Sequence, residues 1–408
     1  MNSTPLEDQV HDALHRQVDP MQHSPLTVTD VRQRARLIQR RRTIAAGAAV
    51  AAALAVAVPV GLAMDGPARR SDVPPATQTP TITGPVRIDP RSASVGDPPH
   101  VTLVDATTRT LVAGGEEYVL PESYDQITRY RDGWIAVFDD QRAPTLHILD
   151  SRFDVVEYVL NASALTVTDD GSRVAYTNHD GYRWVVVDNE VTGEQAERTT
   201  ALPNGSVEAR VRTVGFLPDD GLVAAQTDPA DGTETTFIVT PEGTTKPLPG
   251  LIEAVSASPA TGMVAGLTSV DMESAQSCSA LVDGRDSNGD AAWETCDHQL
   301  GAFSPDGQHL VGLAEYFDGP GSPSLSILDA TTGEPVIDFE LTAAPQRVVA
   351  IAPEVVWEDD QTLLATYIDG TEQYVVRLGL DGTVERVAGP VTNDDSTLSL
   401  RLTPGRID

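Results

Sequence analysis

A tight turn between two short apolar runs stands at Phe303-Ser304-Pro305-Asp306-Gly307-Gln308-His309-Leu310-Val311. The Asp-Gly pair supplies the positive backbone angle that a tight hairpin needs, so this stretch predicts two strands joined by a turn. Similar turns precede five other apolar runs. The six copies are Arg131–Val137, Asp169–Ala175, Pro218–Ala224, Ser258–Ala265, Ser304–Val311 and Glu358–Leu364.

A second recurring pattern ends an apolar run with an aspartate and a polar turn, as in Leu328-Asp329-Ala330-Thr331-Thr332-Gly333. Successive copies of either pattern lie about 40 to 50 residues apart, which is the spacing of β-propeller blades. The clear copies end at Asp105, Asp150, Asp188, Asp283 and Asp329, and degenerate copies stand at Thr240 and before Asp381.

The chain after His100 is therefore predicted to be all-β, a β-propeller of about seven four-stranded blades; six or eight blades are the alternatives. The surplus copy of the second pattern comes first, at Asp105, so the chain is expected to enter the ring partway through a blade. The run Thr397–Leu402 would then return to complete that blade, which would leave no long exposed edge.

The turn at Ser304-Pro305-Asp306-Gly307 resembles the repeat of the TolB-like and WD40-like bacterial β-propellers, and Leu328–Gly333 resembles the strand and turn that follow it there. The layout as a whole is similar to membrane-anchored actinobacterial propeller proteins of unknown function. This resemblance implies an architecture and a binding platform. It does not imply a reaction, because the fold hosts many unrelated functions.

An uncharged apolar run, Thr43–Met64, follows the arginines Arg40–Arg42. As a helix it would reach roughly 33 Å, enough to cross a hydrocarbon core once, and the arginines before it predict a cytoplasmic N-terminus. A cleavable signal peptide and a twin-arginine export signal are the alternatives. The predicted parts are a cytoplasmic basic tail with helical segments at 1–42, a transmembrane helix at 43–64, a Pro/Thr-rich linker at 65–99 and an extracytoplasmic propeller at 100–408.

The net charge is −32, from 28 basic and 60 acidic residues, and the negative charge lies beyond the basic tail. Such a domain repels nucleic acid, which is excluded as a partner. The two cysteines, Cys278 and Cys296, fall in the part expected outside the cell, so they are predicted to form a disulfide. With only His298 nearby, they do not complete a zinc site.

One loop carries oxygen side chains at the spacing of a calcium-binding loop. The candidate ligands are Asp286, Asn288, Asp290, Glu294 and Asp297. Ala291 stands where an EF-hand loop needs glycine, and the flanking sequence is not helical, so an ordinary loop is the alternative. No other cofactor is expected.

No Gly-x-Ser-x-Gly nucleophile motif is present, and no hydrolase-sized segment follows the predicted propeller. The histidines are scattered, and paired acids such as Asp169-Asp170 and Asp359-Asp360 coincide with turns, where aspartate caps its own backbone. The chain is therefore expected not to be an enzyme. A propeller hydrolase or lyase, with acids gathered from distant blades, is the distant alternative.

The expected function is that of a non-enzymatic binding platform in the cell envelope, whose propeller face recognises an envelope protein, a peptide or a glycan. The alternative is a transmembrane signalling protein whose cytoplasmic tail, residues 1–42, binds a sigma factor or another regulator. In both, one helix places the protein in the cell membrane.

Overall fold

The computed structural model describes residues 82 and 84–407, apart from 140–143, 194–196, 204–207, 287, 318–320, 343–346 and 393–397. The predicted tail, the predicted transmembrane helix Thr43–Met64 and most of the predicted linker lie outside these residues. Within the described part of the chain, no helix is long and apolar enough to cross a membrane. The tail and the transmembrane helix thus stay predictions.

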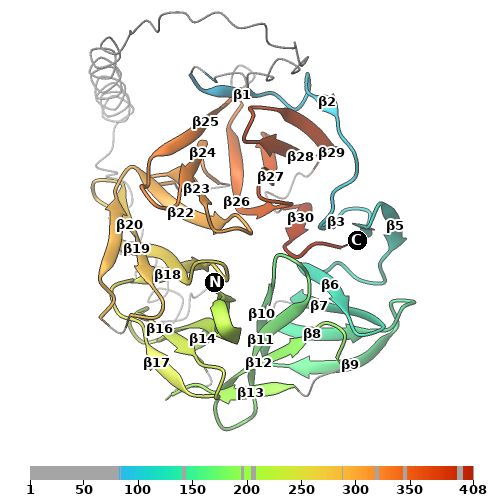
Figure 1. Ribbon diagram of the computed structural model, residues 1–408. Coiled ribbons are helices and arrows are strands. Elements are labelled where there is room, and N and C mark those ends of the chain that lie inside the picture. The colour runs from blue at the N-terminus through green and yellow to red at the C-terminus, as the bar shows by residue number, and fades with distance from the viewer. Residues whose placement is uncertain are drawn as a thin grey trace, which may run out of the picture. The chain divides into compact units, whose positions relative to one another are not determined.

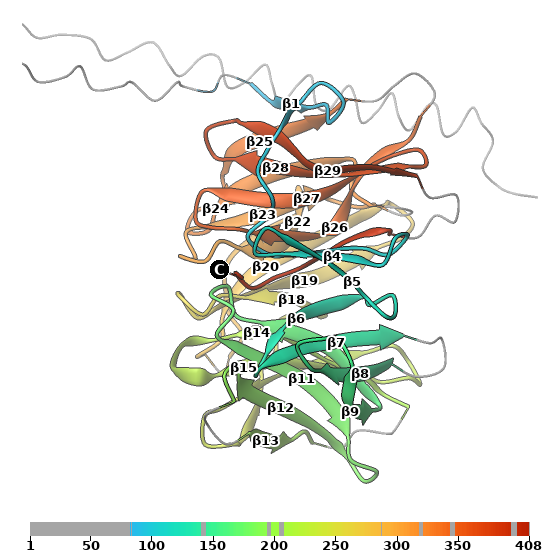
Figure 2. The same ribbon diagram turned by 90° about the vertical axis from the view of Figure 1, so that its right-hand side faces the viewer.

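Seven sheets surround a common centre as the blades of a β-propeller, which confirms the predicted all-β fold and the predicted seven blades (Figures 1 and 2). Each blade is built on four antiparallel strands, which are named below from the innermost outward. Blade 1 contains β30 (Leu400–Thr403), β3 (Thr102–Asp105), β4 (Thr110–Ala113) and β5 (Glu116–Val119). Blade 2 contains β6 (Gln126–Tyr130), β7 (Gly133–Asp139), β8 (Pro144–Leu149) and β9 (Val155–Leu160). Blade 3 contains β10 (Ala162–Val167), β11 (Arg173–His179), β12 (Trp184–Glu190) and β13 (Arg198–Ala201).

The remaining blades follow in chain order. Blade 4 contains β14 (Arg210–Phe216), the 3-10 helix η3 (Pro218–Asp220), β15 (Leu222–Thr227), β16 (Glu234–Val239) and β17 (Thr245–Pro247). Blade 5 contains β18 (Glu253–Ala257), β19 (Met263–Asp271), β20 (Gln276–Asp283) and β21 (Ala291–Thr295). Blade 6 contains β22 (His298–Phe303), β23 (His309–Ala314), β24 (Ser324–Asp329) and β25 (Pro335–Leu341). Blade 7 contains β26 (Val349–Trp357), β27 (Thr362–Asp369), β28 (Glu372–Gly379) and β29 (Val384–Thr392).

The ring closes as the sequence predicts, because β30 returns from the C-terminal end to become the innermost strand of blade 1. It pairs antiparallel with β3, from Thr102 opposite Thr403 to Asp105 opposite Leu400. The copy at Asp105 differs from the others in its place within the blade. Asp105 ends the second strand of its blade, whereas the other copies of that pattern lie at or near the end of the third strand.

The turn chemistry explains why the first two strands of a blade form a hairpin. In blade 6 the Ser304 hydroxyl donates to the Asp306 carboxylate (2.7 Å), and the backbone N–H of His309 donates to the Ser304 hydroxyl (2.9 Å). Gly307 has a φ of +69°, a conformation that glycine adopts at little cost. The Ser-Pro-Asp-Gly stretch is thus a self-capped turn.

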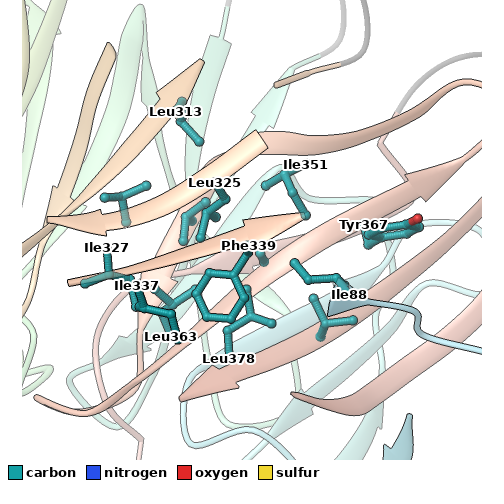
Figure 3. Close-up of a cluster of buried hydrophobic side chains, with 14 of the residues drawn as sticks. Ile88, Leu313, Leu325, Ile327, Ile337, Phe339, Ile351, Leu363, Tyr367 and Leu378 are labelled. Atoms are coloured by element: carbon teal, nitrogen blue, oxygen red, sulfur yellow. The ribbon is translucent and has the colours of Figure 1, made fainter. Parts of the chain in front are cut away.

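Seven apolar clusters are found among the described residues, and each fills the interface between two neighbouring blades. The cluster between blades 6 and 7 has the most members (Figure 3). It includes Phe339 and Tyr367 of the blades and also Ile88, whose side chain is 0% exposed. A residue of the predicted linker is therefore part of the core.

The predicted linker at 65–99 needs a correction, since its last third belongs to the propeller. Strand β1 (Val86–Ile88) adds parallel to β25 on the outer edge of blade 6, and β2 (Ser94–Val95) adds parallel to β29 on blade 7. Between them the Arg91 guanidinium lies 2.5 Å from the buried carboxylate of Asp369. Few apolar residues suffice in this segment, because the partner strands supply the backbone hydrogen bonds.

Candidate functional site

A cavity of about 500 Å³ opens at one mouth of the ring. Turns between the first and second strands of blades 3, 5, 6 and 7 line it, and the chain after β30 adds Arg406. These turns belong to four copies of the first recurring pattern, Asp169–Ala175, Ser258–Ala265, Ser304–Val311 and Glu358–Leu364, brought together from separate blades. We call this site the acidic mouth. Its charged lining side chains are Asp169, Asp170, Glu358, Asp359, Asp360 and Arg406.

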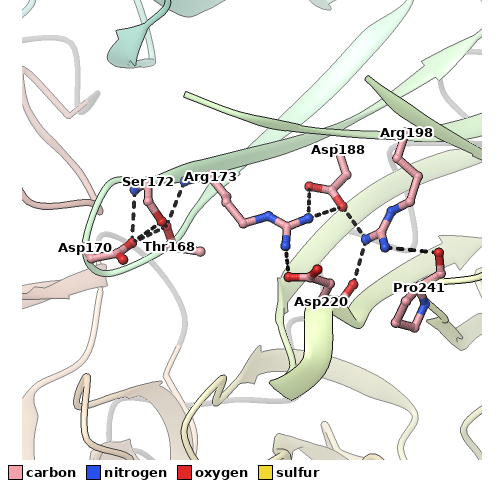
Figure 4. Close-up of polar contacts among 8 residues, drawn as sticks. All are labelled: Thr168, Asp170, Ser172, Arg173, Asp188, Arg198, Asp220 and Pro241. Carbon is pink, nitrogen blue, oxygen red and sulfur yellow. Dashed lines mark hydrogen bonds and ion pairs between the residues drawn. The ribbon is translucent and has the colours of Figure 1, made fainter. Parts of the chain in front are cut away.

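Several of these carboxylates hold the turns in shape, as the sequence predicts for paired acids. Asp170 accepts hydrogen bonds from the hydroxyl and the backbone N–H of Ser172 (2.7 and 3.0 Å), as Figure 4 shows. Asp359 accepts from the backbone N–H of Gln361 (2.8 Å). Asp360 links two blades, because it accepts from the backbone N–H of Asp306 (2.9 Å). The mouth is therefore preorganised by its own turns.

Asp169 differs from its neighbours. Its carboxylate accepts no hydrogen bond from the described residues, while its carbonyl oxygen accepts one from the backbone N–H of Arg406 (2.8 Å). Partial burial and the nearby carboxylates of Asp170 and Asp360 raise the pKa of Asp169 to about 6. At neutral pH this carboxylate is charged in a site where like charges repel it, so a cation bound there would relieve the repulsion.

Glu358 also lines the acidic mouth, but its charge is already matched. Its buried carboxylate receives hydrogen bonds from Nε and Nη2 of Arg377 (2.5 and 3.0 Å) and from the backbone N–H of His100 (2.8 Å). The hydrogen bonds to Glu358 raise the pKa of Arg377. Glu358 therefore anchors the wall of the mouth, and the aspartates supply the rest of its negative charge.

A buried ion-pair network lies behind the Asp170 turn (Figure 4). The carboxylate of Asp188, 2% exposed, accepts two hydrogen bonds from Nη2 of Arg173 (2.8 and 2.7 Å), and Arg198 also pairs with it. Both arginines also contact Asp220 of blade 4. Arg173 pairs with the Asp220 carboxylate, and Nη2 of Arg198 donates to the Asp220 carbonyl oxygen (2.6 Å). Since Arg173 follows the turn directly, this network ties the mouth to two blades.

The opposite mouth holds a second cavity, of about 470 Å³. Gln126, Glu354 and Leu400 line it near the starts or middles of inner strands, and Arg401 pairs with Asp125 there. The charged groups of this cavity are mostly balanced by that pair. The acidic mouth is therefore the stronger candidate for a charged ligand.

The structure separates the residues of the predicted calcium loop. Asp286 caps the backbone N–H of Asn288 (3.0 Å) in the β20–β21 connection, whereas Glu294 lies on β21 and accepts from the Thr268 hydroxyl (2.7 Å). Asp290 stands just before β21 and Asp297 just after it. In the described parts of the chain, no group of three or more His, Cys, Asp or Glu side chains is placed to hold a metal. The calcium site stays a prediction.

The disulfide is present as expected. Cys278 on β20 is joined to Cys296, which directly follows β21, so the bond ties the outermost strand of blade 5 to its neighbour.

Sequence reasoning identified the aspartates of the acidic mouth as turn residues and gave them no further role. The hydrogen bonds of Asp170 and Asp359 confirm the turn role. What it missed is that turns from blades 3 and 7 share one cavity. The available signal was the equal position of these acids in each repeat, because equivalent turns of a propeller lie around the same mouth.

Comparison with known protein families and with curated proteins gives no match. Among solved structures, a prolyl endopeptidase matches with a TM-score of 0.47 at 13% identity, over 71% of this chain and 44% of that one. TolB from Acinetobacter baumannii matches with a TM-score of 0.36 at 12% identity, over 74% and 64% of the two chains. An acylaminoacyl peptidase matches with a TM-score of 0.42 at 12% identity, over 65% and 46%. This chain spans less than two thirds of the length of each of these three proteins.

These matches correct one expectation. The chain is expected from its sequence not to be an enzyme, in part because propellers of this kind imply binding and no reaction. Two of the three structures are peptidases, so possession of the fold does not exclude catalysis, and that expectation is wrong as an inference from the fold. The resemblance to TolB-like propellers is confirmed only as a resemblance of fold. What the solved structures share with this chain is the β-propeller.

Proposed function

We propose that this chain is a binding platform of the cell envelope whose acidic mouth takes a cationic group of a peptide or protein partner. The helix Thr43–Met64 holds it in the membrane, the tail at 1–42 lies in the cytoplasm and the propeller lies outside. The observation that carries the choice of ligand is the gathering of Asp169, Asp170, Asp359 and Asp360 from two blades around one cavity.

Size and charge both support a cationic side chain as the bound group. A cavity of about 500 Å³ falls within the range of ligand pockets, which is roughly 300 to 1,000 Å³. An arginine or lysine side chain presented by a partner would enter it, and the charged aspartates would stabilise it. The net charge of −32 also steers basic partners toward the domain.

The pKa of Asp169 gives the proposal a pH dependence. A cation favours the charged form of Asp169, whose pKa without ligand is raised to about 6. Binding is therefore expected to weaken as the pH falls through 6, because a proton then competes with the ligand.

Calorimetric titration of the chain with acetyl-Gly-Arg-Gly-Arg-Gly-amide tests the proposal. We expect saturable binding at pH 7.5, a loss of about tenfold in affinity in the variant Asp169→Asn/Asp360→Asn, and weaker binding at pH 5. The matched control is Asp231→Asn/Asp271→Asn, which removes the same charge from turns between second and third strands, at the other end of the blades. Equal losses in both variants would mean that only net charge matters, and would contradict a site at the mouth.

The envelope placement is tested separately. Protease added to intact cells is expected to degrade the propeller at 100–408 and to spare the tail at 1–42. Full protection of the propeller in intact cells, with cleavage after permeabilisation, would contradict the proposed topology.

A further inference from the structure

The outer edges of the seven blades are treated differently. Strands β1 and β2 cover the edges of blades 6 and 7. The outer strands of blades 1, 3, 4 and 5 are short, charged or secured. These strands are β5 with two glutamates, β13 whose Arg198 is held in the ion-pair network, β17 with Lys246 and Pro247, and β21 beside the disulfide. Such features are the usual protection of a sheet edge.

Strand β9 of blade 2 has less of this protection, since Glu157 is its single charged residue. It runs from Val155 to Leu160 without proline, glycine or lysine, and it pairs only with β8 among the described strands. Its side chains Tyr158 and Leu160 are 60% and 64% exposed. Val156, at a bulge in the pairing, is exposed as well. An apolar strand with an open edge and an apolar exposed face normally has a partner.

Comparison with strand β25, which receives β1, shows which part of β9 could receive an added strand. Glu157 pairs with Ile148, two residues before Asp150, as Ile337 pairs with Ile327, two residues before Asp329. The stretch of β25 that receives β1, Phe339–Leu341, therefore corresponds to residues 159–161. The exposed positions held by Asp338 and Glu340 in blade 6 are held by Tyr158 and Leu160 in blade 2. These two exposed positions are therefore acidic in blade 6 and apolar in blade 2.

Tyr158 rests on a row of aromatic rings that holds it in place. Its ring meets His147 edge to face, with centroids 5.0 Å apart, and His147 stacks on Phe138 at 5.0 Å. Buried Tyr124 backs the row through its hydroxyl, which lies 3.3 Å from Nδ1 of His147. An exposed tyrosine that is ordered in this way is a suitable anchor for a partner, because little side-chain entropy is lost on contact.

Charge indicates which partner fits. Strand β9 and the turn before it carry Asp150, Asp154 and Glu157 against one arginine, Arg152. A second copy of this chain would bring the same acidic edge and another net charge of −32, so self-pairing is disfavoured. A basic strand would place its cationic side chains beside Glu157 and its apolar side chains over Tyr158 and Leu160.

We propose that the outer edge of blade 2 is a docking site for an extended segment of another protein, with alternating basic and apolar residues, which adds to β9 as a parallel strand. The chain itself adds β1 and β2 in this manner to blades 6 and 7. Backbone hydrogen bonds to residues 157–161 then provide affinity, and the apolar contacts with Tyr158 and Leu160 provide specificity. This surface is separate from the acidic mouth.

The test uses the full chain and the peptide acetyl-Lys-Val-Lys-Val-Lys-Val-Lys-amide. We expect saturable binding with a Kd below about 1 mM and hydrogen-exchange protection of residues 157–161. The variant Tyr158→Asp/Leu160→Glu, which copies the blade 6 residues, should bind at least tenfold more weakly. Val119→Glu, a matched change at the 79% exposed position of β5, should bind as the unchanged chain does.

Two further measurements keep the outcome clear. Peptides N-methylated on alternate amides should differ, with one methylation pattern abolishing binding and the other retaining it, since only one edge of an added strand faces β9. Asp169→Asn/Asp360→Asn removes binding of the peptide's lysines at the mouth but should leave the protection of residues 157–161 as before, so a failure at the mouth is distinguishable from a failure at this edge. The proposal would be overturned by a Kd above 1 mM or by equal binding of the two N-methylated peptides. It would also be overturned by a dimer of this chain that the variant Tyr158→Asp/Leu160→Glu abolishes.

Discussion

The outer edges of blades 6 and 2 occupy the same place in the repeat and have opposite surfaces. In blade 6, β1 covers β25, Ile88 lies in one apolar cluster with Phe339, and the exposed side chains beside the covered stretch are Asp338 and Glu340. In blade 2 no described strand covers β9, and the corresponding positions are held by the exposed side chains of Tyr158 and Leu160. This chain therefore protects these positions either with its own N-terminal strands or with polar residues, and positions 158 and 160 of β9 have neither.

The largest expected effect is the loss of the covering strand's anchor. Ile88→Ala should lower the free energy of unfolding by about 3 kcal/mol, because it leaves a cavity in the core between blades 6 and 7. Val95→Ala on β2, where the side chain is exposed, is the control and should change it by less than about 0.5 kcal/mol. Denaturant unfolding measures both. Equal, small effects would mean that β1 is not part of the folded unit.

A second way to examine edge protection is the disulfide of blade 5. Replacing both cysteines, Cys278→Ala/Cys296→Ala, should lower the free energy of unfolding by about 3 kcal/mol, since the bond restricts the unfolded chain. In thermal unfolding of the unchanged chain, reductant should lower the free energy of unfolding as much as the double substitution does. Reductant should have no effect on the variant. An unchanged midpoint in both would contradict a stabilising role.

Arg91→Ala should lower the free energy of unfolding by about 2 kcal/mol at neutral pH, because it removes one partner of the buried Asp369 carboxylate. The other partner, Nη1 of Arg347, remains 3.6 Å from that carboxylate. Hydrogen bonds from Arg91 and Arg347 lower the pKa of Glu372. A lowered folded-state pKa adds stability above the unfolded pKa and loses it as the pH falls. The cost of Arg91→Ala should therefore shrink below about pH 4, in unfolding curves measured from pH 7 to 3. A cost independent of pH would contradict the ion pairing.

The smallest effect on stability is expected at the uncovered edge of blade 2, on strand β9. Tyr158→Asp/Leu160→Glu should change the free energy of unfolding by less than about 1 kcal/mol, because both side chains are mostly exposed. Denaturant unfolding checks this in parallel with the peptide titration. A large loss would show that Tyr158 serves the aromatic row more than a partner, which would weaken the contrast between the two edges.

Much of the fold follows from local sequence. Asp-Gly turns such as Asp306-Gly307 and alternating apolar runs fix hairpins within a few residues, and their regular spacing predicted the seven blades and the returning strand β30. The linker was mistaken where it meets the propeller, because β1 and β2 pair with strands roughly 250 to 290 residues away and have too few apolar residues to signal a strand.

The candidate site was predictable only in part. Asp170 and Asp359 were identified as turn-capping residues, and their hydrogen bonds agree. The raised pKa of Asp169 was not predictable, since it arises from burial and from Asp360, which lies on another blade.

The hairpin strands of the blades, the turns, the number of blades and the acidic charge were readable from the sequence, because each depends on residues close together in the chain. The tertiary structure was needed to show which turns share a mouth, which carboxylates are compensated by an arginine and which sheet edges are covered. These depend on ring closure, which brings distant residues within a few ångströms and sets their burial.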